Sequence, residues 1–170
     1  GAKVALLEET DWVGGQAIAV PNMDEGINGR DYIRQSGIYS EFIERIRSYY
    51  NAKGKPVGTC YWSDSTICFE PSVGQQILLS LLQENNLDLF LRIKAAGVLR
   101  SGNVIKGVDT NRGRFESKVV IDATEYGDII ALTPARYRVG NSVSGNINND
   151  SCVQDITYTA IIKRYPNGVP

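Results

Sequence analysis

The short strand-like run at residues 3–7, Lys-Val-Ala-Leu-Leu, constrains the fold of this chain more than any other feature. It is too short for a helix and shows no alternation of polar and apolar residues, which is typical of a strand buried on both faces of a sheet. Such strands belong to parallel sheets whose faces are covered by helices. The run stops at Glu8, and Gly14 and Gly15 follow after a polar segment. Because open α/β sheets bind ligands at the carboxyl ends of their strands, we expect a binding site here.

The next segments predict helices that alternate with strands. Residues 38–50 place apolar side chains at helical spacing, and residues 51–56 close this helix with a glycine and a proline. A capping box at residues 72–75, Ser-Val-Gly-Gln, predicts the start of a second helix that ends at residues 85–86. Residues 87–95 then alternate as a strand does, so the chain completes a βαβ-like step.

Turn signals at residues 101–103 and 111–113 predict a small antiparallel meander at about residues 95–117. Its last strand runs into a second continuous apolar run at residues 118–121, which we expect to be another parallel strand. This run also stops at an acidic residue, Asp122, and small residues follow. Both acidic ends are thereby predicted to lie at the same edge of one sheet.

Composition and charge exclude several classes of partner. The 170 residues include 18 basic and 19 acidic side chains and no basic cluster, so neither nucleic acid nor an anionic membrane surface is an expected partner. No apolar run approaches the roughly 20 residues of a membrane span. Histidine is absent, which removes the commonest general base and most metal sites. Any chemistry therefore has to come from carboxylates, tyrosines, cysteines or a cofactor.

The sulfur-containing residues give two further expectations. Cys60, Cys68 and Cys152 do not have the C-x-x-C spacing of zinc or redox sites, and we expect small buried side chains in a reducing compartment, by default the cytoplasm. The only methionine is Met23, which suggests that the chain is a fragment of a longer protein.

Several segments together resemble one family. They are GAKVALLEETDWVGGQ at residues 1–16, FEPSVGQQILLSLL at 69–82, KVVIDATEYGDIIAL at 118–132 and YRVG at 137–140. They look like a bacterial family of FAD-dependent oxidoreductases with the glutathione-reductase-type Rossmann fold. The resemblance runs, with gaps, from residue 1 to about residue 164. It implies an α/β fold, in which a partial Rossmann-like FAD-binding domain at residues 1–135 contains the meander and residues 136–170 start a substrate domain or form a tail.

The resemblance also implies roles for individual residues. Glu8 would bind the adenosine ribose of FAD. The residues that would line the flavin-side loop are Gly14, Gly15 and Gln16. The later turn that would close over the dinucleotide follows Asp122 and consists of Ala123, Thr124, Glu125, Gly127 and Asp128.

One element of the family is missing from this sequence. Members carry Gly-x-Gly-x-x-Gly roughly 20 residues before the ribose-binding acid, and too few residues precede Glu8 for it. Because this element supplies most pyrophosphate contacts, FAD binding is predicted for the intact protein and is in doubt for this chain alone. Its absence would also leave sheet edges unpaired, which predicts a rearranged sheet or a homo-oligomer.

Each of these assignments has a simpler alternative. Glu8 could be a solvated residue at a strand end, and Gly14-Gly15 could be a plain turn. Glu125 and Asp128 could stabilise the positive end of a helix at residues 126–132. Asp122 with either of these carboxylates lacks the further ligands that a metal ion needs, so no metal site is predicted.

Two functions remain open at this point. The first is a fragment of an FAD-dependent oxidoreductase that transfers a hydride from an unidentified small organic substrate to flavin, with no residue assigned as the general base. The alternative is a stand-alone, non-enzymatic α/β domain that no longer binds FAD and acts as an interaction or assembly module. Flavin absorption that stays with the protein through gel filtration would separate them.

Overall fold

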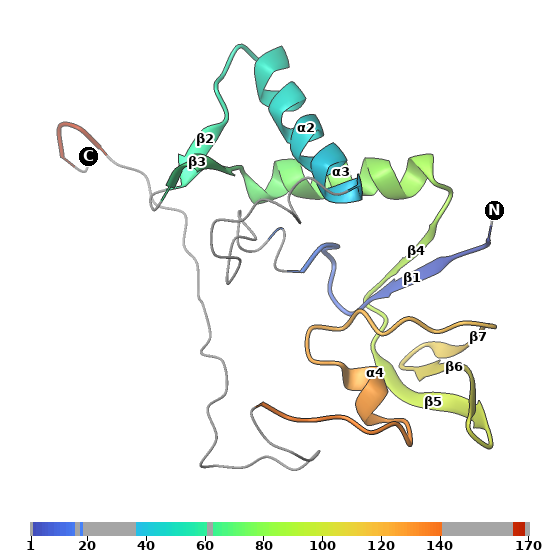
Figure 1. The fold of residues 1–170 in the computed structure, drawn as a ribbon. Coiled ribbons are helices and arrows are strands. Elements are labelled where there is room, and N and C mark those ends of the chain that lie inside the picture. Colours follow the sequence, from blue (N-terminus) through green and yellow to red (C-terminus); the bar gives the residue numbers. More distant parts are fainter. Residues whose placement is uncertain (1, 16–17, 19–36, 61–62, 141–164, 169–170) are drawn as a thin grey trace. The chain divides into compact units, whose positions relative to one another are not determined.

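The computed structural model describes residues 2–15, 18, 37–60, 63–140 and 165–168. The chain divides into two units, Gly1–Pro134 and Ala135–Pro170, and most of the second unit lies outside the described residues. The elements of the first unit, labelled in Figure 1, are β1 (Ala5–Glu8), α2 (Gly37–Ala52), β2 (Gly58–Cys60), β3 (Ser63–Cys68), α3 (Pro71–Glu84), β4 (Asp88–Leu91), β5 (Ala95–Ser101), β6 (Val104–Thr110), β7 (Gly113–Glu116) and α4 (Asp128–Ala131).

Helices α2 and α3 carry the main hydrophobic core of this unit. α2 confirms the helix predicted at residues 38–50. It ends in a left-handed Gly54, after which Lys55 N donates a hydrogen bond to Tyr50 O at 3.1 Å. The two helices pack around Ile46, which is fully buried. The shared core consists of Ile18, Phe42, Ile46, Tyr50, Ile67, Phe69, Val73, Ile77 and Leu81.

The start of α3 differs from the prediction. The helix begins at Pro71 with Glu70 as its N-cap, and no side chain caps the first turn. The predicted capping box at residues 72–75 is therefore wrong. Proline has no N–H to satisfy and a backbone angle suited to the first helical position, so it starts the helix earlier than a serine cap would. The predicted end at residues 85–86 is confirmed by Asn86, which takes the left-handed conformation with φ 54°.

Strands β1 and β4 form a parallel pair, with Ala5 opposite Asp88 and Glu8 opposite Leu91. This arrangement confirms the βαβ-like step. The prediction that the first strand is buried on both faces is wrong, because the side chains of β1 are half-buried or exposed. Within the described residues β1 pairs with β4 alone, so no further strand covers its second edge.

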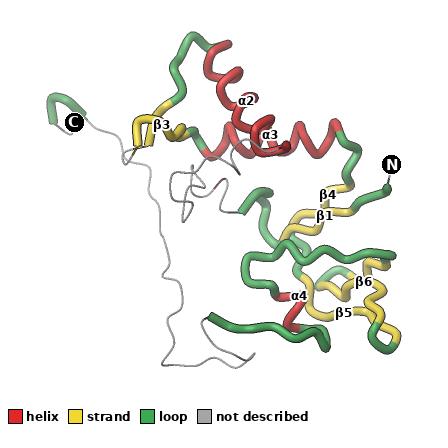
Figure 2. Tube along the Cα trace, viewed as in Figure 1, coloured by secondary structure: helices red, strands yellow, loops and turns green. Residues whose placement is uncertain are grey.

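Strands β5, β6 and β7 form the predicted antiparallel meander, in that order. The meander touches the parallel pair through Phe115 and Phe90, whose rings meet edge to face with centroids 5.1 Å apart. The strand predicted at residues 118–121 is not formed, and Figure 2 draws the segment after β7 as loop. Val119 is 73% exposed and Ile121 is 83% exposed. A strand needs a ladder partner, and none of the described residues offers one to this segment.

Together these elements confirm the predicted α/β fold class, a mixed arrangement consistent with a partial Rossmann-like domain. One cysteine prediction is wrong: Cys68, at the end of β3, takes part in a disulfide bond and is only half-buried. It is therefore not a small buried thiol. The side chains of Cys60 and Cys152 lie outside the described residues.

Candidate functional site

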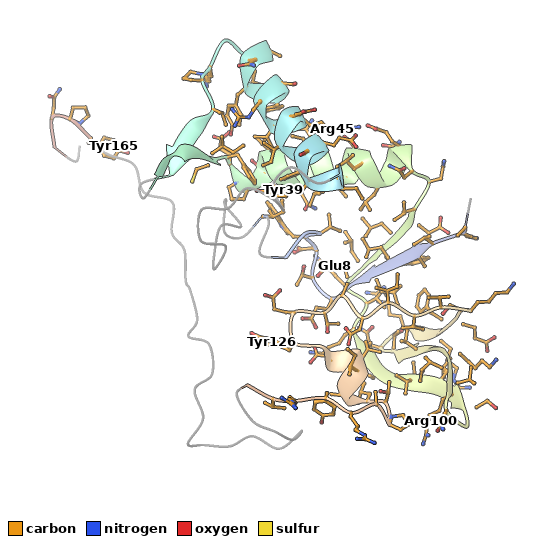
Figure 3. All side chains as sticks on the ribbon, in the orientation of Figure 1. Glu8, Tyr39, Arg45, Arg100, Tyr126 and Tyr165 are labelled. Carbon is orange, nitrogen blue, oxygen red and sulfur yellow. The ribbon has the colours of Figure 1, made fainter. Side chains whose placement is uncertain are left out.

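Glu8 stands at the carboxyl end of β1 and is half-buried (Figure 3). Its Oε1 accepts hydrogen bonds from Thr10 N at 2.8 Å and from Thr10 Oγ1 at 2.7 Å. Thr10 Oγ1 also lies 2.9 Å from the carbonyl oxygen of Trp12, so its single hydrogen serves one of the two acceptors at a time. Among the described residues no hydrogen bond or ion pair reaches Glu8 Oε2. Within the described part of the chain, the carboxylate is thus tethered through one oxygen and open at the other.

The path of the chain after β1 is fixed by the segment that follows β4. Ile93 N donates to Glu8 O and Arg92 N donates to Thr10 O, both at 2.9 Å. The Arg92 guanidinium also lies 3.2 Å from the Asp11 carboxylate, although both side chains are exposed. Backbone hydrogen bonds therefore hold Glu8 in place, and the exposed ion pair adds little to them.

The predicted flavin-side loop rests on α3. Val13 N donates a hydrogen bond to Gln75 Oε1 at 3.2 Å. Gly14 has φ 107°, and a Cβ at this position would lie 2.5 Å from Leu78 Cδ1 and 2.7 Å from Ile18 Cγ1. Ile18 N donates to Gly15 O at 3.2 Å and closes the turn. The positive φ of Gly14, together with its packing against the helix, is therefore enough to account for glycine at this position, as the plain-turn alternative holds.

Asp122 organises the later turn through hydrogen bonds. Its Oδ1 accepts from Thr124 N at 3.0 Å and from Thr124 Oγ1 at 2.7 Å, and its Oδ2 accepts from Ile130 N at 2.7 Å. Thr124 Oγ1 in turn accepts from Asp128 N at 2.7 Å. Burial alone would raise the pKa of the Asp122 carboxyl, but the hydrogen bonds outweigh it and hold this pKa below its usual range. Asp122 is therefore a structural carboxylate with both oxygens occupied.

The remaining residues of the later turn are mostly exposed. Helix α4 is shorter than the helix predicted at residues 126–132, because Gly127, its N-cap, takes a left-handed conformation with φ 71°. Asp128 lies in the first turn, where the helix-dipole alternative places it. Ala123 and Glu125 are exposed.

The structure brings two of the predicted segments together. A Cβ on Gly15 would lie 3.5 Å from Glu125 Oε2, so the flavin-side loop and the later turn are neighbours. Glu8 lies at the start of the same loop, and no hydrogen bond or ion pair among the described residues joins it to the later turn. Gln16 lies outside the described residues.

The sequence reasoning missed the contact made by Gln75. It assigned this side chain to a capping box, whereas its amide oxygen binds the loop after β1. One signal could have revealed it. Gln75 is a polar residue on the side of α3 that also carries the buried Gly74 and the half-buried Leu78, so it faces the interior rather than solvent.

The described residues offer neither a metal-binding cluster nor a membrane-spanning helix. Within that part of the chain, no group of three or more acidic, cysteine or histidine side chains is arranged to hold a metal ion. None of the described helices has the length and apolar character that crossing a bilayer requires.

Comparison with known proteins identifies one family. The family model described as FAD dependent oxidoreductase matches residues 1–166 of the chain. Among curated proteins, none gives a significant match.

Proposed function

This chain belongs to the FAD dependent oxidoreductase family, and from that premise we propose that it forms part of a flavoenzyme that oxidises a small organic substrate. The family implies that the intact protein binds FAD. When bound, FAD would supply the redox chemistry by accepting two electrons as a hydride from the substrate. The residues of this chain supply contacts that hold the cofactor.

The open oxygen of Glu8 is the observation that carries this proposal. Thr10 holds Oε1, so the carboxylate is oriented before any ligand arrives, and Oε2 is left to accept hydrogen bonds from the two ribose hydroxyls. Asp122 also ends an apolar run and also binds a threonine two residues later, but Ile130 N occupies its second oxygen. Of the two acidic ends, Glu8 is the one equipped to bind a ligand.

The described residues fit the ribose and the flavin side of FAD better than its pyrophosphate. Asp122 and Thr124 already take amide hydrogens of the first turn of α4, which would otherwise be available to an anion. The Glu125 carboxylate beside Gly15 would repel a phosphate group, so we assign this loop to the uncharged flavin ring. Residues 1–170 alone are therefore expected to bind FAD weakly.

A titration of the full chain with FAD, followed by quenching of flavin fluorescence, tests the proposal. Glu8→Gln keeps an amide oxygen for Thr10 but replaces the acceptor for the ribose, and it is expected to weaken binding by about 1 to 3 kcal/mol. Glu9→Gln is the matched control. It removes the same charge one residue later, where the interaction of Glu9 within the described part of the chain is an exposed ion pair with Lys94 at 3.4 Å.

The outcomes separate the two functions. Equal FAD affinity in Glu8→Gln and Glu9→Gln would retire Glu8 as the ribose acceptor. A wild-type chain that stays colourless through gel filtration and does not quench added FAD would instead favour the non-enzymatic interaction or assembly module.

A further inference from the structure

Helix α3 presents one face to the loop that follows β1. Gly74 and Leu78 lie one turn apart on this face, and Gln75 lies beside them. A Cβ on Gly74 would lie 2.7 Å from Ile18 Cδ1, so the missing side chain lets the loop approach the helix closely. Gly14 and Leu78 make the corresponding close contact at the other end of the loop. The missing side chains of Gly14 and Gly74 thus leave room for Leu78 and Ile18 to pack between the loop and α3.

Close packing against a helix isolates the backbone groups of a loop from water. Val13 is only 3% exposed, and its N–H donates to Gln75 Oε1 at 3.2 Å. A buried N–H without an acceptor costs free energy comparable to a lost hydrogen bond. An apolar residue at position 75 would leave this N–H without its acceptor. The hydrogen bond from Val13 N to Gln75 Oε1 therefore fixes which part of the loop lies against α3. Apolar contacts alone are non-directional and do not specify this position.

We propose that Gln75 is a positioning residue for the FAD site, which holds the loop at residues 13–15 on α3 so that Gly15 lies beside Glu125 of the later turn. Gln75 contacts the loop rather than the cofactor. This inference rests on the proposed function in one respect, namely that the loop faces the flavin.

Amide hydrogen exchange in the full chain, without any cofactor, tests the contact directly. Gln75→Met keeps the length of the side chain and removes the acceptor, so the Val13 amide is expected to exchange about tenfold faster. Gln75→Glu keeps an acceptor oxygen and is expected to retain slow exchange. Gln76→Met makes the same chemical change at the exposed neighbouring position, and it should leave the Val13 amide unchanged.

Two further readings distinguish positioning from a general loss of structure. The amide of Ile46 in the core of α2 should exchange at the wild-type rate in all variants, because the change is confined to the loop. FAD, added as the probe, should bind about tenfold more weakly to Gln75→Met than to Gln76→Met.

The possible results separate this inference from the proposed function. Unchanged Val13 exchange in Gln75→Met would overturn the assignment of Gln75, as would equally fast exchange in Gln75→Glu. Faster exchange with equal FAD affinity in Gln75→Met and Gln76→Met would overturn the link between the loop and the cofactor. No quenching of FAD by the wild-type chain would count against the proposed function, while the exchange rates would still decide whether Gln75 holds the loop.

Discussion

The helical pair α2–α3 and the segment at residues 118–132 are held in place by different forces. Apolar side chains pack on one another in the core of the pair: Ile46 is fully buried, and Phe42 of α2 meets Phe69, just before α3, edge to face with ring centroids 5.6 Å apart. In the segment, Ile121 is 83% exposed, and the turn after it is fixed by the hydrogen bonds of Asp122. The two helices of the pair bury each other's apolar side chains, whereas an apolar strand depends on a neighbouring strand to pair with it.

The largest predicted effect lies in the helical pair. Ile46→Ala removes a side chain that is 0% exposed and leaves a cavity, so the free energy of unfolding should fall by about 2 to 5 kcal/mol. Urea unfolding measures the loss. Ile38→Ala, the same change at a position of α2 that is 75% exposed, should stay within about 0.5 kcal/mol of wild type. Similar losses in the two variants would show that the pair is not held by apolar burial.

An intermediate effect is predicted at Asp122, where hydrogen bonds take the place of burial. In Asp122→Asn, an N–H₂ group replaces one carboxylate oxygen and faces either the Ile130 or the Thr124 donors, so we expect a loss of about 1 to 3 kcal/mol at pH 7. Asp128→Asn is the matched control. It removes a charge from the same turn but none of these hydrogen bonds, and it should cost less than about 1 kcal/mol.

The effect of Asp122 should also depend on pH, in a direction set by its lowered pKa. A carboxyl whose pKa is lower in the folded state stabilises the fold above its unfolded pKa, roughly 3.9, and loses this contribution as pH falls through the folded value. The difference in stability between wild type and Asp122→Asn should therefore be complete at pH 7 and shrink below about pH 4. A difference that is constant from pH 7 to pH 3 would contradict the role of the ionised carboxylate.

The same contrast explains what the sequence could predict. Helix α2 and the meander follow from periodicity and turn residues, which are local signals. The parallel pairing of β1 with β4 follows from the order of the strands and helices along the chain. Residues 118–121 carry the same apolar signal as β1, yet they form no strand, because a strand also needs a partner that local sequence does not specify.

The candidate site divides in a similar way. Glu8 and Asp122 each bind a threonine two residues later, so these contacts lie within one local turn. The contact of Gln75 with Val13 joins residues 62 positions apart. The place of Gln75 on α3 indicates only that its side chain faces the interior, and which backbone group it meets depends on how α3 packs. The neighbourhood of Gly15 and Glu125 depends on tertiary packing in the same way.

The smallest predicted effect is at Ile121. Its side chain is 83% exposed, so Ile121→Ala should change the free energy of unfolding by no more than about 0.5 kcal/mol. Urea unfolding of the full chain at two protein concentrations measures this. Val119→Ala, at a position that is 73% exposed, should behave in the same way.

A loss of more than about 1 kcal/mol in Ile121→Ala would show that the side chain is covered in solution. The dependence on concentration would then identify the cover. If the loss grows as the protein is concentrated, a second copy of the chain pairs with residues 118–121, because association stabilises the fold by mass action. This result would agree with the homo-oligomer that unpaired sheet edges predict. If the loss is the same at both concentrations, a segment of the same chain covers Ile121, and the contrast with the helical pair would no longer hold.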